Sequence, residues 1–563
     1  MRPLRSNFEP GTTRWAVRRS QWRAMGIRDS DLLKPKIAVV NSSSQLSVCY
    51  AHVDGVVALL ADEIRSAGGL PFEIRTAAPS DFVTSAGRAG RYLMPTRDLI
   101  VNDIEVAVEG ALLDGMVCVS SCDKTTPAHL MAAARLDIPT IVVVGGYQLG
   151  GACMGRPVDI DDVYESVGAV ASGGMSIDEL TEMTEVAIVG PGVCAGLGTA
   201  NTMHILAEAL GMALPGSSPV RAGSERMLSN ARDAGRRIVE LVEDDLRPRD
   251  ILTAEAIQNA VAVDLAIAGS VNSIRHLQAI AVEASLDVDV RELVEATNVP
   301  TIVAIRPNGP YRIEDLERAG GTQAVMRRLS DHLGLSARTV AGGTVADLVA
   351  TATVLDDEIV RDVDDPFRSD PGLALLRGNL APEGALVKLG GVPRDRLAFS
   401  GPSVIFETED DAILGIGDGR LRPGVVAVLR GMGPKGGPGT VFAAGFVAAL
   451  NGAGLSKDVA CVTDGELSGL NRGLIVGQVM PEAAEGGPLA LLLPGETITI
   501  NIPARTIDME VEASEIATRR AGWRPPAAPT ARSVLTQYWH LVQPLSDGAV
   551  LAPAAMHLPR AAE

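Results

Sequence analysis

The feature that most constrains the fold is a regular alternation of strand-like and helix-like segments over roughly the first 150 residues. Short apolar runs predict strands at residues 36–41, 71–75, 116–120 and 140–144. Longer amphipathic runs predict helices between them, at 53–66 and 96–113, and Gly68-Gly69 ends the first helix. This order is typical of a parallel sheet covered by helices. We therefore predict an α/β fold with an N-terminal parallel-sheet domain.

The last third of the chain has a different pattern. Runs rich in Val, Ile, Leu and Thr predict short strands at 425–430, 459–463, 489–493, 497–502 and 506–512. Residues 496–502 alternate strictly between polar and apolar, which indicates a half-exposed strand. We predict a C-terminal β-rich, barrel-like domain over residues 372–563. The N-terminal domain is predicted to span residues 1–360, and the acidic, proline-containing stretch 355–371 is the candidate linker.

The segments between these two regions are predicted to be mostly helical. Helices are expected over 160–190, 224–300 and 322–333, with one strand at 301–306. The final 30 or so residues are rich in Ala and Pro, and we expect them to wrap the surface or a partner subunit.

Composition narrows the class of function. The chain has 563 residues, of which 46% are hydrophobic, so it can bury large cores. A net charge of −19 argues against nucleic acid or an anionic membrane as the main partner. No apolar run approaches the roughly 18 residues that span a bilayer, and the Arg-rich N-terminus lacks the apolar segment of a secretory signal. Six cysteines in so long a chain predict a reduced, cytoplasmic protein.

Three side chains capable of binding metals stand side by side in one predicted turn. Cys122 offers a thiolate, Asp123 a carboxylate, and Lys124 an ammonium group, or a carbamate after reaction with CO₂. A thiolate suits iron–sulfur or zinc, whereas a carboxylate suits Mg²⁺. The turn can therefore lie between a soft metal site and a hard one. The alternative is a buried cysteine followed by a solvated Asp-Lys pair, and the turn alone does not separate the two.

Further candidate ligands also follow predicted strands. Cys49 and Asp81 lie in loops after the first and second strands, and Cys194 lies in a Gly-rich loop before a helix. Ligands of parallel sheets gather beyond the carboxyl ends of the strands, so Cys49, Asp81 and the Cys122 turn can converge there. The cysteines are too far apart in sequence for a zinc ribbon, and the histidines lack the spacing of a zinc hydrolase. Taken alone, Asp81 and Asp123 are better explained as ordinary surface residues.

The other cysteines and a second Gly-rich segment have simpler interpretations. Cys118 and Cys461 lie within apolar strands and are expected to be core residues, and Cys153 is expected to be structural. The loop 433–439 follows a strand, and its backbone N–H groups are suited to binding an anion. It is not a P-loop, because no Gly-Lys-Ser/Thr follows.

Several long motifs together resemble one family, the dihydroxy-acid dehydratase / sugar-acid dehydratase family. The resemblance extends from about residue 30 to 520. Its motifs are Cys122-Asp-Lys-Thr-Thr-Pro-Ala128, the Cys194 loop with Thr199-Ala-Asn-Thr-Met203, Arg249-Asp-Ile-Leu-Thr253, Leu376-Arg-Gly-Asn-Leu-Ala-Pro382, residues 433–439, Thr463-Asp-Gly465 and Pro481-Glu-Ala-Ala-Glu-Gly-Gly-Pro488. Thr125-Thr126 and Cys49-Tyr-Ala-His52 are more similar to the aldonate branch of the family.

The resemblance implies a mechanism and its cofactors. Cys49, Cys122 and Cys194 would hold an iron–sulfur cluster, [2Fe–2S] rather than [4Fe–4S], and an open iron would act as a Lewis acid on the C3 hydroxyl of the substrate. Asp81, Asp123 and carbamylated Lys124 would bind Mg²⁺, which would hold the substrate carboxylate and C2 hydroxyl. Ser468, as an alkoxide stabilised by the cation, would remove the C2 proton. Loss of water would give an enol and then a 2-keto acid. The implied assembly is a homodimer or a dimer of dimers with the site between the domains.

The chain departs from the family pattern at two charged positions. Phe442 stands where the family usually has a Mg²⁺-binding Glu, and Glu466 stands where the family usually has Arg after Thr-Asp-Gly or Thr-Asp-Ala. One hypothesis is that Glu466 supplies the lost metal ligand. The rival is that Mg²⁺ binding is weakened, because Mg²⁺ demands near-ideal oxygen coordination. The segment Phe82-Val-Thr-Ser-Ala also differs from the family and points to an altered substrate pocket.

Our leading interpretation is a hydro-lyase that acts on a 2,3-dihydroxy carboxylate, a branched dihydroxy acid or an aldonate. The second interpretation is a family paralogue that keeps the fold and the dimer but serves as a binding or regulatory protein. A third is an enzyme without iron that uses its cysteines as nucleophiles. A brown colour after anaerobic purification would separate the first from the third.

Overall fold

The N-terminal half contains a four-stranded parallel sheet. In the structure, a computed structural model that describes residues 3–80, 83, 90–437, 443–467 and 472–552, the strand order is β2-β1-β3-β4. The strands are β1 (Lys36–Asn41), β2 (Leu70–Arg75), β3 (Gly115–Ser120) and β4 (Thr140–Val144). Every residue of β1, β3 and β4 is buried, as expected for a parallel sheet covered on both faces. This confirms the predicted N-terminal α/β architecture.

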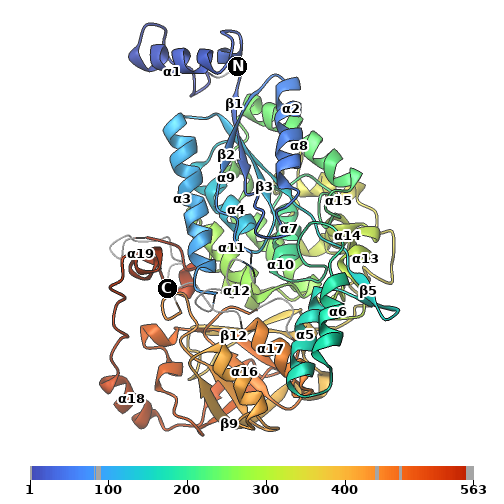
Figure 1. Cartoon of the computed structure of the whole chain (residues 1–563), viewed down its shortest axis with the longest axis vertical. Helices are drawn as coiled ribbons and strands as arrows, with labels where there is room; N and C mark the ends of the chain where they lie inside the picture. Colours follow the sequence, from blue (N-terminus) through green and yellow to red (C-terminus); the bar gives the residue numbers. More distant parts are fainter. Residues whose placement is uncertain (1–2, 81–82, 84–89, 438–442, 468–471, 553–563) are drawn as a thin grey trace.

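Helices cover both faces of this sheet. In Figure 1, α2 (Val53–Ser66) and α8 (Glu225–Asp244) lie on one side of the strands, with α3 (Leu93–Ala111) and α4 (Thr125–Leu136) on the other. Helix α2 ends as predicted, because Gly68 adopts a φ of +97° that other residues rarely accept. Helix α1 (Thr13–Ala24) stands at one end of the molecule and buries none of its residues.

A largely helical region follows. Its helices are α5 (Ile160–Ala171), α6 (Ile177–Val186), α7 (Thr199–Ala209), α9 (Pro248–Ile251), α10 (Ala254–Ile267), α11 (Val271–Glu283), α12 (Val290–Ala296), α13 (Ile313–Arg318), α14 (Gly321–Arg328) and α15 (Val345–Thr351). A small hairpin pairs β5 (Gly151–Cys153) with β6 (Arg156–Val158). Helix α11 packs against α4, α7, α12 and the C-terminal strand β8 (Gly384–Lys388), so it lies in the middle of the molecule.

The C-terminal region is a nearly closed barrel. Its sheet has the strand order β14-β13-β9-β10-β11-β12-β8-β7. Besides β8, these strands are β7 (Leu373–Leu376), β9 (Ala398–Phe406), β10 (Val426–Leu429), β11 (Ala460–Thr463), β12 (Ile475–Met480), β13 (Thr497–Asn501) and β14 (Thr506–Met509). Arg377, directly after β7, pairs with Thr506 of β14 and so joins the two edges. The barrel-like prediction is therefore confirmed.

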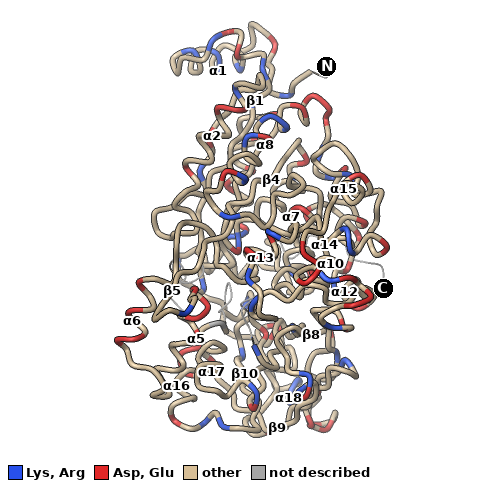
Figure 2. Tube along the Cα trace, turned by 90° about the vertical axis from the view of Figure 1, so that its right-hand side faces the viewer, with Lys and Arg blue, Asp and Glu red and all other residues tan. Residues whose placement is uncertain are grey.

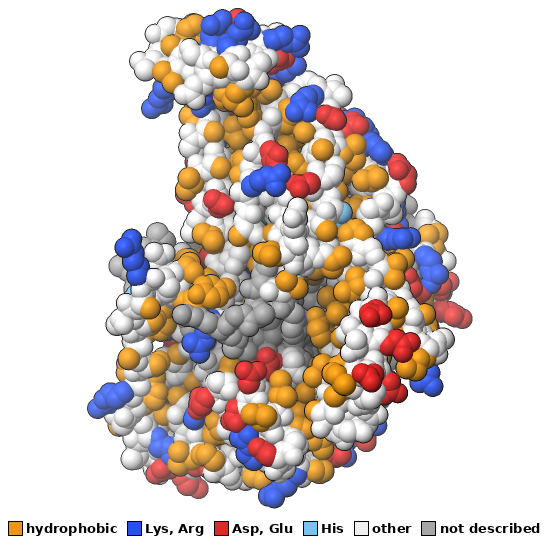
Figure 3. All heavy atoms as spheres, in the orientation of Figure 1, with side chains coloured by type: hydrophobic (Ala, Val, Ile, Leu, Met, Phe, Trp, Pro, Cys, Tyr) orange, Lys and Arg blue, Asp and Glu red, His pale blue; other side chains and the backbone are white. Residues whose placement is uncertain are grey.

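Alternate strand residues explain how the barrel packs. Val426, Val428 and Val462 fill its interior, whereas Ala427 and Cys461 belong to the larger core shared with the rest of the chain. Helices α16 (Glu409–Gly417) and α17 (Ala444–Gly452) accompany these strands, and α18 (Ala513–Gly522) and α19 (Val534–Leu541) follow them. Figure 3 shows a hollow between the upper and lower parts of the molecule on this face.

Two strand predictions are wrong. Residues 301–306 form only isolated bridges, because this buried segment lies across the end of α10, where Ile302 N–H donates to Ala266 O at 2.9 Å. Residues 489–493 fall largely in a 3₁₀ helix, Pro488–Leu491, which begins at a proline and buries Leu489. Short apolar runs suit either structure, and their neighbours decide between them.

Charged residues of both signs occur along the whole trace in Figure 2, and α1 contains several arginines. None of the described helices is both long enough and apolar enough to cross a membrane.

The described part of the C-terminal tail packs back onto the N-terminal domain of the same chain. Tyr538 of α19 is buried against Met94 of α3. Arg97 of α3 is fully buried and donates to the carbonyls of Gly548 at 3.0 Å and Ala549 at 2.7 Å. The tail therefore covers its own chain, which agrees with one of the two expected roles, and residues 553–563 lie outside the described part.

Replacing Arg97 with Ala should strongly destabilise the fold. The substitution leaves two tail carbonyls without their donor and leaves the buried Asp98 without the guanidinium 3.2 Å away. Breaking such a buried pair costs about 3–5 kcal/mol. Urea unfolding should show this loss, while Arg420→Ala, which removes a surface pair with Asp411, should change the midpoint much less. Equal changes in the two variants would contradict the anchoring role.

Candidate functional site

Two of the predicted cysteine ligands meet at the carboxyl edge of the parallel sheet. Cys49 lies in the loop after β1, and Cys122 in the turn after the neighbouring strand β3. Ser121 Oγ donates to Cys49 O at 2.5 Å, which ties the turn to the loop. The two thiols are hydrogen-bonded, and this contact lowers the pKa of Cys49 to about 7 despite its burial. Cys49 is thus readily converted to a thiolate, the form that binds metals.

The loop of Cys194 lies against the same segments. Gly192 N–H donates to Val48 O at 3.3 Å, which places this loop beside Cys49. Asn201, in the first turn of α7, donates to Cys194 O at 2.7 Å and fixes the loop. One turn further along α7, His204 Nε2 donates to Ser121 O at 2.7 Å. Hydrogen bonds therefore connect all three cysteine-bearing segments.

The three cysteines are a donor set that suits an iron–sulfur cluster. A cluster of several iron and sulfide ions is wider than one ion, and it is held by separate cysteine thiolates. Three cysteines on connected loops, one with a lowered pKa, meet that need.

The remaining cysteines are structural, as predicted. Cys118 and Cys461 are fully buried within β3 and β11, and burial raises the pKa of both thiols, that of Cys461 to about 12. Cys153 is buried in a small apolar cluster with Val158 and Ala187.

The Asp-Lys pair that follows Cys122 is deeply buried. Lys124 is fully buried and Asp123 is 1% exposed, so the alternative of a solvated pair is wrong. Lys124 Nζ lies 2.9 Å from Asp123 Oδ2 and 3.0 Å from Glu466 Oε2. Glu466 follows β11 of the C-terminal barrel and is itself fully buried. The two halves of the chain therefore meet in an ion pair at this turn.

A second cation completes this buried cluster. Arg275 of α11 is 2% exposed and forms an ion pair with Glu466. His276, beside it, is neutral, because burial and then the nearby Lys124 lower its pKa well below the usual value. Two cations and two carboxylates thus balance in a site that excludes water. Sequence reasoning missed Arg275, because α11 mixes polar and apolar residues and its sequence does not mark this arginine as a site residue.

A carboxylate oxygen of this cluster lacks a hydrogen-bond partner among the described residues. Asp123 Oδ1 is buried and accepts no hydrogen bond from any described residue. An unsatisfied buried carboxylate oxygen is costly unless a cation binds it, and oxygen ligands are those Mg²⁺ prefers. Asp123 and Glu466 supply two such groups, and a carbamate on Lys124 would supply a third. Asp81, Phe442 and Ser468 lie outside the described residues.

The described part of the Gly-rich loop, residues 433–437, binds an anionic side chain of the protein itself. The backbone N–H groups of Lys435 and Gly436 each donate to the carboxylate of Glu482 at 2.9 Å. Asp464 similarly accepts from Met432 N–H at 2.8 Å and from Ala483 N–H at 2.9 Å. Asp464, two residues before Glu466, thereby connects the segment after β10 to the segment after β12.

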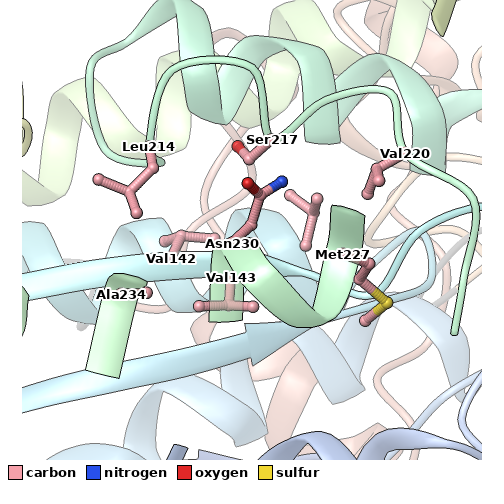
Figure 4. A pocket seen from close by; sticks show the side chains of 9 residues that line it. Val142, Val143, Leu214, Ser217, Val220, Met227, Asn230 and Ala234 are labelled. Carbon is pink, nitrogen blue, oxygen red and sulfur yellow. The ribbon is translucent and has the colours of Figure 1, made fainter. Parts of the chain in front are cut away.

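The structure has a small pocket between β4 and α8 and a larger, open pocket beside the Cys194 loop. The pocket in Figure 4, between β4 and α8, measures only about 10 Å³, and Ser217 and Asn230 are its polar lining. It has room for about one water molecule. An open pocket of about 590 Å³ is lined by Arg306, Arg312 and Arg472. Arg306 O accepts a hydrogen bond from Leu197 of the Cys194 loop, so this second pocket adjoins the cysteine-bearing segments.

Comparison with known proteins identifies the family. The model for the N-terminal domain of dihydroxy-acid/6-phosphogluconate dehydratases matches residues 34–348, and the C-terminal model matches residues 358–549. The chain belongs to this dehydratase family. A relative from Ignicoccus hospitalis, named dihydroxy-acid dehydratase, is 42% identical over 541 residues, 95% of this chain and 98% of that protein. Relatives of the same name from Acetivibrio thermocellus and Pyrococcus abyssi are 41% and 42% identical over 539 residues, 95% of this chain and 97% of each relative.

Membership of the dihydroxy-acid/6-phosphogluconate dehydratase family makes this protein an enzyme that eliminates water. The two family models divide the chain between residues 348 and 358, at the start of the stretch considered a linker.

Proposed function

We propose that this dehydratase converts a 2,3-dihydroxy carboxylate, a branched dihydroxy acid or an aldonate, into a 2-keto acid. The observation that carries the proposal is the meeting of the Cys49–Cys122 pair with the buried cluster of Asp123, Lys124 and Glu466 at one edge of the sheet. Thiolates suit iron and carboxylates suit Mg²⁺. Elimination of a hydroxyl from an anionic substrate needs one Lewis acid for the hydroxyl and positive charge for the carboxylate, and these two groups of ligands would provide them. The names of the relatives support the same class of substrate.

Each donor set has a proposed cofactor. Cys49, Cys122 and Cys194 would hold an iron–sulfur cluster, of the [2Fe–2S] type. Asp81, Asp123, carbamylated Lys124 and Glu466 would hold Mg²⁺. When bound, these groups supply a Lewis acid for the departing C3 hydroxyl and positive charge for the carboxylate and the C2 hydroxyl.

The protein's own residues would hold the substrate away from water and move its proton. Ser468 is the proposed base, and it follows Glu466 by only two residues, a span of at most about 7 Å of extended chain. A serine hydroxyl is a weak base at neutral pH, so it needs nearby positive charge to lose its own proton. The contact between Glu466 and Lys124 places the start of this loop at the charged cluster. The same contact supports the hypothesis that Glu466 supplies the carboxylate missing at position 442.

Anaerobic turnover tests this function. The protein would be reconstituted with iron and sulfide, supplied with Mg²⁺, and assayed for 2-keto acid formation from dihydroxyisovalerate and a panel of aldonates. We expect turnover of at least one member of the panel. A cluster-loaded protein that leaves every member unchanged would favour the binding or regulatory interpretation instead.

A further inference from the structure

One buried side chain of the N-terminal region holds the backbone directly before Ser468. Asn272, in the first turn of α11, is fully buried. Its Nδ2 donates to Leu467 O at 2.5 Å, and its Oδ1 accepts from Leu467 N–H at 3.2 Å. Both backbone groups of Leu467 are therefore bound by one amide across 195 positions of sequence. Because a peptide N–H needs an acceptor and a carbonyl needs a donor, this pairing also fixes the orientation of the amide.

The amide of Asn272 is itself held on several sides. Its Nδ2 also donates to Thr199 Oγ1 at 3.1 Å, and Gln478 Nε2 donates to its Oδ1 at 3.3 Å. Thr199 Oγ1 lies 2.8 Å from Ser270 Oγ, the N-cap of α11. The amide is thus part of a satisfied buried network, which confines it to one orientation.

Helix α11 also contacts Glu466, the residue before Leu467. Arg275 lies about one turn after Asn272 and forms the ion pair with Glu466, so the same face of the helix contacts both 466 and 467. Helix α11 packs against α4 and α7, the two helices that follow the Cys122 turn and the Cys194 loop. A rigid helix therefore connects the proposed cofactor-binding segments to the loop of the other domain (Figure 1).

We propose that Asn272 is a positioning residue for the base of the reaction, and that it acts by fixing the peptide groups of Leu467. The inference rests on the proposed role of Ser468 in the dehydration. A serine base must stand within hydrogen-bond reach of the C2 proton, and a displacement of about 1 Å can cost about 100-fold in rate. Asn272 does not touch the substrate in this scheme. It would fix the position of the Leu467 backbone relative to the turn that carries Lys124.

The test compares Asn272→Asp with a matched control. Asn259 of α10 is also fully buried, and it binds Gly334 in the same way, with Nδ2 donating to Gly334 O at 2.9 Å and Gly334 N–H donating to Oδ1 at 2.7 Å. Both substitutions keep the shape of the side chain and remove its Nδ2 donors. The control therefore loses equivalent bonds to a loop that carries none of the site residues.

We expect Asn272→Asp to lower kcat about 100-fold while KM changes less than about 3-fold. The primary isotope effect on kcat with substrate deuterated at C2 should rise, because proton removal becomes slower than the other steps. Asn259→Asp should lose stability but keep the kcat and the isotope effect of the wild type. Asn272→Ala removes the Nδ2 donors and also the Oδ1 acceptor of Leu467 N–H, without adding a buried charge. If Asn272→Asp fails to fold, the same kcat and isotope-effect comparison is made with Asn272→Ala.

The outcomes separate this inference from the proposed function. An active wild type whose Asn272 variants match the Asn259 variant in kcat and isotope effect would overturn the inference alone. A wild type inactive on the whole panel would overturn the proposed function. In that case hydrogen exchange still decides whether the contact holds the loop: Asn272→Ala should speed exchange of the Leu467 amide at least about 10-fold, and an unchanged rate would overturn the inference.

Discussion

Cys122→Ser should abolish both the visible absorbance of the reconstituted enzyme and its turnover, with a rate loss of at least about 1,000-fold. Cys122 follows β3 and hydrogen-bonds to the thiol of Cys49. Its replacement therefore removes one of the three proposed thiolate ligands of the cluster. A Lewis acid contributes several kcal/mol to such a reaction, and each 1.4 kcal/mol is a factor of ten in rate. Cys49→Ser and Cys194→Ser are expected to behave alike.

The matched control for these variants is Cys461→Ala. Cys461 is fully buried within β11 of the barrel, and its thiol has a raised pKa of about 12. This variant should keep the absorbance, the iron content and the turnover of the wild type. Iron and sulfide analysis beside the visible spectrum makes the comparison. Retention of the cluster by Cys122→Ser, or its loss from Cys461→Ala, would show that the cysteines have been assigned wrongly.

Glu466→Gln should reduce turnover at least about 100-fold and raise the Mg²⁺ concentration needed for half-maximal rate. The neutral amide removes one carboxylate from the buried cluster and leaves the buried Arg275 without its ion-pair partner. Mg²⁺ would lose an oxygen ligand, and its demand for near-ideal coordination makes that loss expensive. Turnover measured across a range of Mg²⁺ concentrations gives both quantities.

Glu208→Gln controls for the removal of a buried carboxyl group. Glu208 of α7 is also buried and accepts from the N–H groups of Gly216 and Ser218, each at 2.7 Å. Burial raises its pKa to about 8, so an amide is a close substitute near neutral pH. This variant should keep wild-type turnover and Mg²⁺ dependence. Wild-type Mg²⁺ dependence in Glu466→Gln as well would reject Glu466 as a relocated ligand.

The fold of the N-terminal sheet was predictable because three of its strands, β1, β3 and β4, are buried on both faces. β1 and β4 form continuous apolar runs, and their predicted limits agree with the structure. Residues 301–306 were wrongly predicted as a strand, because burial alone does not distinguish a strand from an irregular segment. A short apolar run is buried in either conformation, and here the N–H of Ile302 is satisfied by the end of α10 instead of a neighbouring strand.

The site could be predicted only for residues that directly follow the predicted strands. Cys49 and Cys122 follow adjacent strands, so the topology of the sheet brings them together. Asn272 and Arg275 could not be assigned in this way, because their partners Leu467 and Glu466 lie almost 200 positions further along the chain. Their helix looks like an ordinary core helix, and only the packing of the two domains gives its polar side chains a role.

The most direct test of the dehydratase assignment is the conversion of a 2,3-dihydroxy acid in D₂O, followed by NMR of the product. Ser468 is proposed to remove the C2 proton, and the resulting enol takes its new hydrogen from solvent. We therefore expect a 2-keto acid with one deuteron at C3 and no hydrogen transferred from C2. A product that carries the original C2 hydrogen at C3, or no product from a cluster-loaded enzyme, would contradict the proposal.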